Sequence, residues 1–427
     1  MTDAASSTAI IIGAGHAGGE LAIALRNEGW EGRILLLGEE AHLPYHRPPL
    51  SKAYLAGSVE KSSLSIRPQM AYDKANVEFI GGVRVSRIDR ANQRLELADG
   101  SQLAYDRLAI ATGGRPRPLS VPNAAVAERC ANFHYLRTLD DVEQIRAQLA
   151  PGKRLAIVGG GYIGLEVAAS AIAQGLQVTV LEALPRVLQR VTAAELSAYY
   201  ERKHREAGVD IRTGVQVADL EVTGDTVTAV LCADGSRLAA DLVVVGIGLL
   251  ANTELAAEAG LQVDNGILVD EHAQTSDPQI YAAGDCTNHP NALLGRRLRL
   301  ESVPNALEQS RVAAANMAGK AKTYASVPWF WSDQYELKLK MVGLSEGFER
   351  LVLRGDPASD SFSAFYLKGD KVLAADTVNR PQDFIAAKRL VAEGIAVTDA
   401  QLADDSRYHH MRQQILHFLY EKQPKAA

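Results

Sequence analysis

The sequence predicts an α/β protein made of two Rossmann-like units of the same plan, followed by a C-terminal α+β domain. Two glycine motifs predict the units: GAGHAG over residues 13–18 and GGGYIG over residues 159–164. Each motif follows a short apolar run typical of a buried strand, residues 9–12 and 155–158, and opens into a helical pattern. A strand, a helix and a second strand in this order favour a parallel sheet covered by helices.

The first unit continues with a predicted helix over residues 20–27 and a predicted strand over residues 33–37, which Glu39 follows. A further apolar strand ends at Ala111. The proline-rich segment 115–122 comes directly after it and predicts the exit from this domain.

The second unit repeats the plan, with a predicted helix over residues 163–174 and a predicted strand over residues 177–181. Glu182 closes that strand, 21 residues beyond Gly161. The apolar strand 241–248 then completes the unit.

After the second unit, residues 261–285 are typical of strands and turns and end in Gly284-Asp285. Beyond about Val327, strand-like runs precede a helical tail, which predicts the α+β domain. The runs cover residues 339–342, 350–353, 362–367 and 372–377. We expect three domains: residues 1–114 together with 249–326, residues 115–248, and residues 327–427.

The glycines permit a tight turn and a close approach of the backbone to a pyrophosphate at a helix N-terminus. Two such motifs, each followed by an acid where a ribose-binding residue is expected, predict two bound dinucleotides. Plain structural turns are the alternative. The predicted binding residues are Gly13, Gly15, Gly18 and Glu39 in the first unit and Gly159, Gly161, Gly164 and Glu182 in the second. Two dinucleotides on one chain indicate redox chemistry.

Glu182 predicts which nicotinamide nucleotide the second unit binds. A carboxylate there accepts hydrogen bonds from both ribose hydroxyls and repels a 2′-phosphate, which favours NADH over NADPH. Arg186 and Arg190 lie just beyond it. They leave some tolerance of a phosphate open, and a solvated helix face is their alternative role.

The bulk composition describes an ordinary globular chain, with 47% hydrophobic and 22% charged residues. A net charge of −6 argues against a general nucleic-acid binder, and no apolar run is long enough to span a membrane. The short polar N-terminus fits no signal peptide. Cys130, Cys232 and Cys286 are far apart and match no zinc spacing, so we expect reduced, mostly buried thiols in a cytoplasmic protein and no metal site.

Residues 44–52 form a proline-rich loop followed by a predicted helix start. In a reductase with two dinucleotides, a redox-active cysteine pair would lie here beside the flavin, but the segment holds no cysteine. Electrons therefore cannot leave by thiol–disulfide exchange at this place. Lys52 is the candidate charge beside the isoalloxazine, since an ordinary surface lysine is disfavoured at a helix N-terminus.

Glu166 lies in the predicted helix of the second motif among apolar neighbours. A buried carboxylate needs a partner. Lys52 is a plausible one and the nicotinamide amide a second, while an ordinary exposed helix glutamate is equally open.

Several longer stretches resemble a known family nearly end to end. They are PPLSK over 48–52, LAIATGGRPRP over 108–118, GGGYIGLE over 159–166, GDC over 284–286, ESVPNALEQ over 301–309 and PWFWSDQYELKLKMVGLSEG over 328–347. The chain resembles the FAD/NAD-linked ferredoxin reductases of bacterial oxygenase systems, which have a glutathione-reductase-like fold. The last two stretches are specific to that branch.

The resemblance implies roles for individual residues. Those expected to contact FAD are Ala17, Glu39, Lys52, Val85, Arg137, Asp285 and Val303, with Asp285 on the ribitol chain. The expected cofactor-binding set also includes Ala111, Tyr162, Ile163 and Gly248. Trp329 and Trp331 match a tryptophan pair near the flavin edge, with hydrophobic hinge packing as an equal alternative. The expected catalytic residues are Lys52, Glu166 and Trp329.

The implied reaction takes two electrons as hydride from NADH to FAD and then passes them singly to an acidic [2Fe–2S] ferredoxin. That ferredoxin would feed a haem-thiolate, cytochrome P450-type monooxygenase, and the reductase would be a monomer or weak dimer. Candidate docking cations are Arg67, Arg296, Arg297, Arg299, Arg311, Lys338, Lys340, Lys388 and Arg389.

Three alternatives stay open. One is a ferredoxin or rubredoxin reductase for another oxygenase. Another is a redox-sensing flavoprotein of the apoptosis-inducing-factor type. The third is a peroxide or disulfide reductase of the same fold, which the missing flavin-side cysteine counts against.

Overall fold

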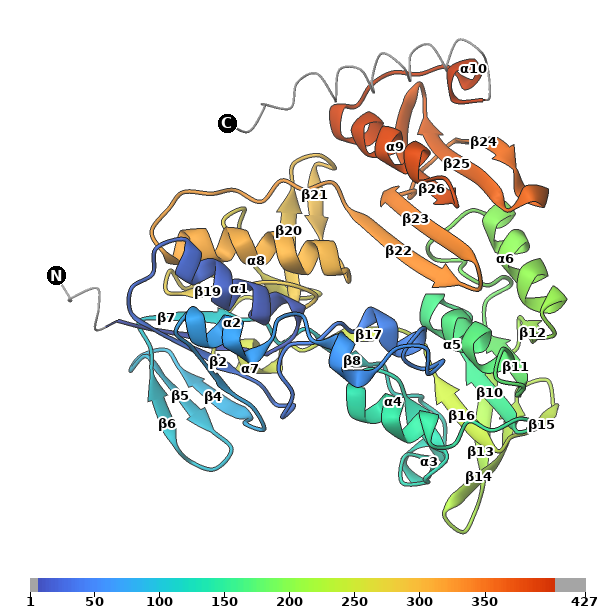
Figure 1. Cartoon of the computed structure of the whole chain (residues 1–427), viewed down its shortest axis with the longest axis horizontal. Coiled ribbons are helices and arrows are strands. Elements are labelled where there is room, and N and C mark those ends of the chain that lie inside the picture. Colours follow the sequence, from blue (N-terminus) through green and yellow to red (C-terminus); the bar gives the residue numbers. More distant parts are fainter. Residues whose placement is uncertain (1–6, 404–427) are drawn as a thin grey trace.

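The computed structural model describes residues 7–403 (Figure 1). The first unit is a parallel sheet in the order β19-β7-β1-β2-β3. Its strands are β1 (Thr8–Ile12), β2 (Arg33–Leu37), β3 (Val77–Ile80), β7 (Arg107–Ile110) and β19 (Ile280–Ala282). Residues 9–12 of β1 are almost fully buried, because a central parallel strand is covered on both faces.

Two layers cover this sheet. Helices α1 (His16–Asn27) and α8 (Val303–Met317) pack together on one face, around Leu21 and Leu36. On the other face Ile10 and Leu35 join a small antiparallel sheet. That sheet is β4 (Val85–Asp89), β5 (Arg94–Leu97) and β6 (Gln102–Ala104), and the short helices of this part are η2 (Pro48–Ser51), η3 (Lys61–Leu64) and α2 (Gln69–Lys74).

The second unit has the same parallel plan, in the order β12-β11-β10-β16-β9. Its strands are β9 (Phe133–Tyr135), β10 (Arg154–Val158), β11 (Gln177–Glu182), β12 (Asp210–Thr213) and β16 (Leu242–Val245). Its helices are α3 (Ala124–Ala127), α4 (Leu139–Arg146), α5 (Tyr162–Ile172) and α6 (Ala194–Glu206), and an antiparallel meander adds β13 (Val217–Thr223), β14 (Thr226–Cys232) and β15 (Arg237–Ala239). The first glycine motif thus lies between β1 and α1, and the second lies between β10 and α5.

Two antiparallel strands, β8 (Gly114–Pro116) and β17 (Leu249–Ala251), link the units. The chain then returns to the first sheet, where β19 pairs with β7. The remaining elements of this return are α7 (Glu254–Glu258), β18 (Ile267–Leu268), β20 (Thr287–Asn291) and β21 (Arg296–Leu298). We propose domain boundaries at these linking strands, near residues 114 and 249.

The C-terminal domain is an antiparallel sheet in the order β22-β23-β26-β25-β24 with a helix on one face. Its elements are β22 (Trp329–Gln334), β23 (Leu337–Gly343), β24 (Arg350–Asp356), η4 (Pro357–Ser359), β25 (Ser361–Lys368), β26 (Lys371–Val378), α9 (Pro381–Glu393) and α10 (Asp399–Leu402). The four strand-like runs correspond to β23–β26, whereas β22 was not predicted. The rest of the predicted helical tail, residues 404–427, lies outside the described residues.

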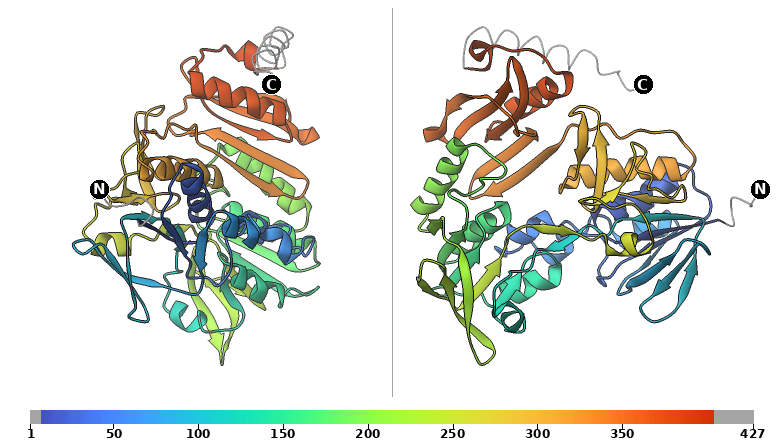
Figure 2. Two further views of the ribbon diagram at one scale, coloured as in Figure 1. Left: turned by 60° about the vertical axis from the view of Figure 1, so that its left-hand side comes forward. Right: turned by 180° about the vertical axis from the view of Figure 1, so that it is seen from behind.

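This domain packs against the second unit, as Figure 1 and both views of Figure 2 show. Strand β22 contacts α5, and Leu339 and Tyr366 share one core with Leu165 and Leu196. Within residues 7–403, no helix is long and apolar enough to cross a membrane. In the same part of the chain, no three His, Cys, Asp or Glu side chains cluster as metal ligands would.

Candidate functional site

The two glycine turns are built alike. Gly13 and Gly159 have φ values of +107° and +111°, and an added Cβ would lie 2.3 Å from the Ala111 carbonyl oxygen or 2.4 Å from that of Gly246. Around Gly15 and Gly161, by contrast, an added Cβ would meet no chain atom within 4 Å. The first glycine therefore makes the turn, and the second leaves room for a pyrophosphate at the helix N-terminus.

The third glycine of each motif holds helix against strand. A Cβ on Gly18 or Gly164 would lie only 1.8 Å or 2.1 Å from the carbonyl oxygen of the first glycine. Both motifs thus satisfy all three steric requirements of a dinucleotide-binding turn.

Polar groups gather around the first turn. Arg137 lies 3.4 Å from Asp285, and Arg47 donates to the Arg137 carbonyl at 2.9 Å. The buried Nε2 atom of His16 has no partner among the described residues. Burial, with help from the neighbouring cations, lowers the pKa of His16 to about 3 and holds the ring neutral. Arg47 also pairs with Glu40 at 2.5 Å, so the open amides of the turn and the unpartnered His16 ring are the groups that fit the diphosphate of FAD.

The other predicted residues of the first site come from α1 and from the return segment after β19. The Cβ atom of Ala17 lies 3.0 Å from an added Cβ on Gly284, and the Gly284 amide donates to Gln309 of α8, the helix that Val303 begins. Burial raises the pKa of Asp285 above its usual range. These residues therefore surround the carboxyl end of β1.

Glu39 and Val85 lie further out. Val83 donates to the Gly38 carbonyl at 2.9 Å, which brings the start of β4 beside Glu39. The Glu39 side chain is 74% exposed and lies 3.8 Å from Arg84. It is turned toward solvent, unlike its counterpart in the second unit.

Glu182 is that counterpart, and its carboxylate is held at the second turn. It accepts hydrogen bonds from the Gly160 amide at 2.7 Å and from the Leu184 amide at 2.8 Å. Arg186 donates to the Thr192 and Gln189 carbonyls of its own loop and to the Ser197 hydroxyl of α6, so its guanidinium is occupied. Arg190 is exposed and lies 4.0 Å from an added Cβ on Gly248.

Two further predicted residues begin α5. Ile163 is 44% exposed beside the second turn. The Tyr162 ring lies 5.2 Å from that of Phe330 of β22 in a tilted arrangement, and its hydroxyl donates to the sulfur of Met341. The second site therefore reaches the C-terminal sheet.

Lys52 and Glu166 form a buried ion pair between the two units. Lys52 Nζ lies 2.7 Å from Glu166 Oε2, and the two side chains are 16% and 3% exposed. Ser51 donates to the same oxygen at 2.5 Å and Ser332 of β22 donates to Oε1 at 2.5 Å. The alternative of an exposed helix glutamate is wrong.

The expected position of Lys52 needs correction. It is the C-cap of the 3₁₀ helix η2, not the start of a helix, because Pro48 and Pro49 begin that helix earlier. A cation is favourable at a helix C-terminus, so the argument from helix-dipole repulsion does not apply. The ion pair with Glu166 is instead the observation that supports Lys52 as the charge beside the isoalloxazine.

Trp329 lies on the face of β22 that packs against α9. Its ring packs at 5.6 Å against Phe384 of α9 and Trp331 lies on the same face of β22. Phe330 and Ser332 face α5 instead, because alternate side chains of a strand point to opposite sides. Trp329 thus lies on the other face of β22 from Ser332, the residue that contacts Glu166, and its role at the flavin edge stays a prediction.

The three cysteines offer no exchangeable thiol. Cys130, Cys232 and Cys286 are all buried and unpaired. Burial raises the pKa of the Cys286 thiol, the one nearest Asp285 in sequence.

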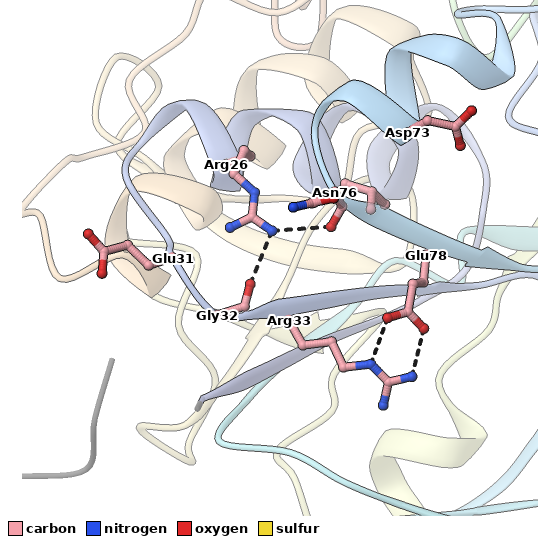
Figure 3. A pocket seen from close by; sticks show the side chains of 8 residues that line it. Arg26, Glu31, Gly32, Arg33, Asp73, Asn76 and Glu78 are labelled. Carbon is pink, nitrogen blue, oxygen red and sulfur yellow. Dashed lines mark hydrogen bonds and ion pairs between the residues drawn. The ribbon is translucent and has the colours of Figure 1, made fainter. Parts of the chain in front are cut away.

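A separate pocket of about 560 Å³ lies at the amino ends of β2 and β3 (Figure 3). Arg33 and Glu78 pair there at 2.6 Å, and Arg26 donates to backbone carbonyls of Gly32 and Asn76. The glycine turn lies at the opposite, carboxyl edge of the sheet, so this pocket is not the dinucleotide site.

Comparison with known proteins agrees with this geometry. A profile described as pyridine nucleotide-disulphide oxidoreductase matches residues 7–310. The chain belongs to that family. A second profile, described as reductase C-terminal, matches residues 329–409.

Individual relatives refine the family. The chain is 55% identical over 404 residues to putidaredoxin reductase CamA of Pseudomonas putida, which covers 94% of this chain and 96% of the relative. It is 44% identical over 395 residues to rhodocoxin reductase of Rhodococcus erythropolis, with 92% of each covered. The crystal structure of a covalent putidaredoxin reductase–putidaredoxin complex matches with a TM-score of 0.92 and 53% identity, covering 96% of this chain and 99% of that one.

The predicted resemblance and fold class are thereby confirmed. This member of the pyridine nucleotide-disulphide oxidoreductase family is a flavoprotein oxidoreductase of the ferredoxin reductase branch that uses FAD and NADH. Sequence reasoning missed four site residues: His16, Arg47, Ser51 and Ser332. Each stands within or next to a motif already singled out, which is the signal that could have found it.

We expect substitutions at the two open glycines to separate the two nucleotide sites. Gly15→Val fills only the open space of the first glycine turn. It should weaken FAD binding by about 10- to 100-fold, which corresponds to an overpacking cost of about 1–3 kcal/mol. The isolated protein should then lose flavin absorption at about 380 and 450 nm. Gly161→Val is the matched control, which should keep one FAD per chain and raise the KM for NADH instead. Equal flavin content in both variants would contradict the assignment.

Proposed function

We propose that this protein passes electrons from NADH through FAD to an acidic [2Fe–2S] ferredoxin that supplies a haem-thiolate monooxygenase, and that it acts as a monomer or weak dimer. The balanced reaction converts NADH and two oxidised ferredoxins into NAD⁺, a proton and two reduced ferredoxins. FAD, when bound, accepts a hydride's two electrons together and releases them singly. The crystal structure of a relative in covalent complex with putidaredoxin supports the proposal.

The buried Lys52–Glu166 pair between two nucleotide turns carries this proposal. It supplies a fixed ammonium where a thiol would otherwise react, and the three cysteines of the chain are buried elsewhere. A flavin site without a reactive thiol suits one-electron transfer to a protein acceptor better than it suits disulfide reduction.

The chain's residues then have distinct roles in the proposal. The amides of the first turn bind the diphosphate of FAD, Arg137 contacts FAD, and Asp285 binds its ribitol chain. Glu182 binds the adenosine ribose of NADH. The ammonium of Lys52 stabilises negative charge that develops during reduction, and Glu166 orients that ammonium.

The ferredoxin would dock on what we call the Trp–Lys patch: Trp329, Trp331, Lys340, Phe384 and Lys388. Lys340 stands opposite Trp331 in the sheet register, so both lie on one face. Lys340 lies 5.4 Å from the Phe384 ring and Lys388 lies 5.6 Å from the Trp329 ring. Within residues 7–403 neither lysine has a carboxylate at ion-pair distance, so both charges are available to an acidic partner.

Most other candidate cations are already paired. Arg296 binds Glu346 at 2.6 Å and Lys338 binds Asp333 at 3.5 Å. Arg67 and Arg311 share Glu20, which leaves one net positive charge there. Arg297 donates to backbone carbonyls, and Arg299 and Arg389 bind Glu301 and Glu393.

We expect ferredoxin reduction to slow as salt rises, because charge attraction between the proteins is screened over about 10 Å at 0.1 M ionic strength. Lys340→Glu should raise the ferredoxin KM by about tenfold, and Arg311→Glu should act in the same direction. Lys153→Glu, at the amino end of β10 and away from this patch, is the control. Ferricyanide turnover with NADH should change much less in every case. A ferredoxin KM that changes neither with salt nor in Lys340→Glu and Arg311→Glu would contradict docking that is steered by these charges.

Mixing the holoprotein with NADH and a [2Fe–2S] ferredoxin tests the function. Rapid bleaching of the ferredoxin absorption supports it. A long-lived reduced flavin–NAD complex with slow turnover would favour the redox-sensing alternative. Rapid reduction of a disulfide or peroxide, with the ferredoxin untouched, would favour the third alternative.

A further inference from the structure

A chain of buried hydrogen bonds runs from the C-terminal domain to Glu166. Ser332 Oγ donates to Glu166 Oε1 at 2.5 Å and accepts from Gln334 Nε2 at 3.2 Å. Gln334 Oε1 lies 2.8 Å from His204 Nε2, and Tyr335 OH lies 2.9 Å from His204 Nδ1. Ser332, Gln334 and His204 are at most 1% exposed.

The bonding possibilities of these groups set one direction for the chain. The Glu166 carboxylate can only accept hydrogen bonds, so the Ser332 hydroxyl donates its one proton to it. The Ser332 oxygen must then accept from the Gln334 amide. The Gln334 carbonyl then requires a proton on His204 Nε2, which leaves Nδ1 to accept from Tyr335. Burial lowers the pKa of His204 to about 4, in agreement with a neutral ring. Each proton in the chain therefore points toward Glu166.

Ser332 has a special place among the donors of that carboxylate. Ser51 and Lys52 both donate to Oε2, whereas Ser332 is the donor to Oε1 within residues 7–403. Ser332 comes from β22 of the C-terminal domain, and His204 comes from α6 of the second unit. Two domains thus hold the far side of the Lys52–Glu166 pair.

We propose that Ser332, oriented by Gln334 and His204, is a positioning residue for electron transfer: it holds Glu166 and balances its charge, so that the C-terminal domain helps to set the reduction potential of the flavin bound beside Lys52. This inference rests on the proposed function, in which FAD binds beside Lys52. Without the Ser332 proton, the negative charge of Oε1 is less compensated. Reduction of a neighbouring group then becomes harder, and the potential falls.

An isosteric pair of variants tests the hydroxyl alone. Ser332→Thr and Ser332→Val add the same bulk at a fully buried position, but only threonine keeps the hydroxyl. In the holoprotein, the two-electron midpoint potential of Ser332→Val should fall by about three- to tenfold in the reduction equilibrium, about 14–30 mV. Ser332→Thr should stay at the wild-type value.

Tyr366→Phe is the matched control for losing a buried hydroxyl between the same domains. Tyr366 OH donates to Asp376, bonds Thr192 and accepts from the Ala193 amide, with no link to Glu166. Its removal should lower the denaturation midpoint but leave the potential unchanged. A potential that shifts equally in Tyr366→Phe and Ser332→Val would assign the effect to general loosening and overturn the proposal.

A nitrogen-15 NMR measurement of His204 gives a readout independent of activity and of bound FAD. A neutral His204 ring protonated at Nε2 is expected at pH 7. A ring protonated at Nδ1, or a cationic ring, would contradict the proposed chain of hydrogen bonds. If wild-type protein holds FAD and reduces ferredoxin while Ser332→Val keeps the wild-type potential, the inference fails and the proposed function stands. If no FAD binds or NADH does not reduce it, the proposed function itself fails.

Discussion

Replacing Lys52 by methionine is expected to lower the free energy of unfolding by about 3–5 kcal/mol, the usual effect of removing one partner of a buried ion pair. Glu166 is 3% exposed and would keep only its two serine donors. The same change should slow reduction of the bound flavin by NADH by about 10- to 100-fold, because a fixed positive charge is lost. Denaturant unfolding with excess FAD and stopped-flow reduction measure the two effects.

The double variant Lys52→Met/Glu166→Gln is the control for an unpaired charge. With both charges removed, much of the lost stability should return, whereas flavin reduction should stay slow. Equal stability of the single and double variants would show that packing of the Lys52 stem, rather than its charge, supports this site.

NADH is expected to exceed NADPH in kcat/KM by about 10- to 1000-fold, because a 2′-phosphate would meet the carboxylate of Glu182. That carboxylate is fixed by the Gly160 and Leu184 amides and cannot turn away without losing both bonds. Glu182→Gln removes the charge at nearly constant shape. This variant should reduce the ratio of kcat/KM for NADH to that for NADPH, mainly by raising kcat/KM for NADPH. Steady-state kinetics with both nucleotides measure it.

Two arginine variants complete this experiment. Arg186→Gln should leave the preference unchanged, because the Arg186 guanidinium already binds two carbonyls of its own loop and the Ser197 hydroxyl. Arg190→Gln should lower the residual NADPH rate, because Arg190 is the exposed cation of this loop. Similar kcat/KM values for the two nucleotides in the wild-type protein would mean that Arg190 overrides the acid.

The sequence by itself determined the two parallel-sheet units and their nucleotide turns. A positive φ at Gly13 and a helix closely packed at Gly18 are local steric demands that only glycine meets, so the motif carries them directly. Buried strands such as β1 and β10 appear as short apolar runs because both of their faces are covered. Strand β22 was not predicted because its aromatic residues suggested a cofactor edge or a hinge, whereas in the structure it pairs with β23 in the sheet.

Only the tertiary structure decided which side chains meet. The contact of Ser332 with Glu166 joins residues 166 positions apart, and the exposure of neither can be deduced from its neighbours along the chain. Likewise, the orientation of Trp329 depends on which face of β22 packs against α9, a choice of one residue in register that reverses every side chain. Local sterics and periodicity can be deduced from the sequence, whereas these pairings depend on how the two units and the C-terminal domain pack against one another.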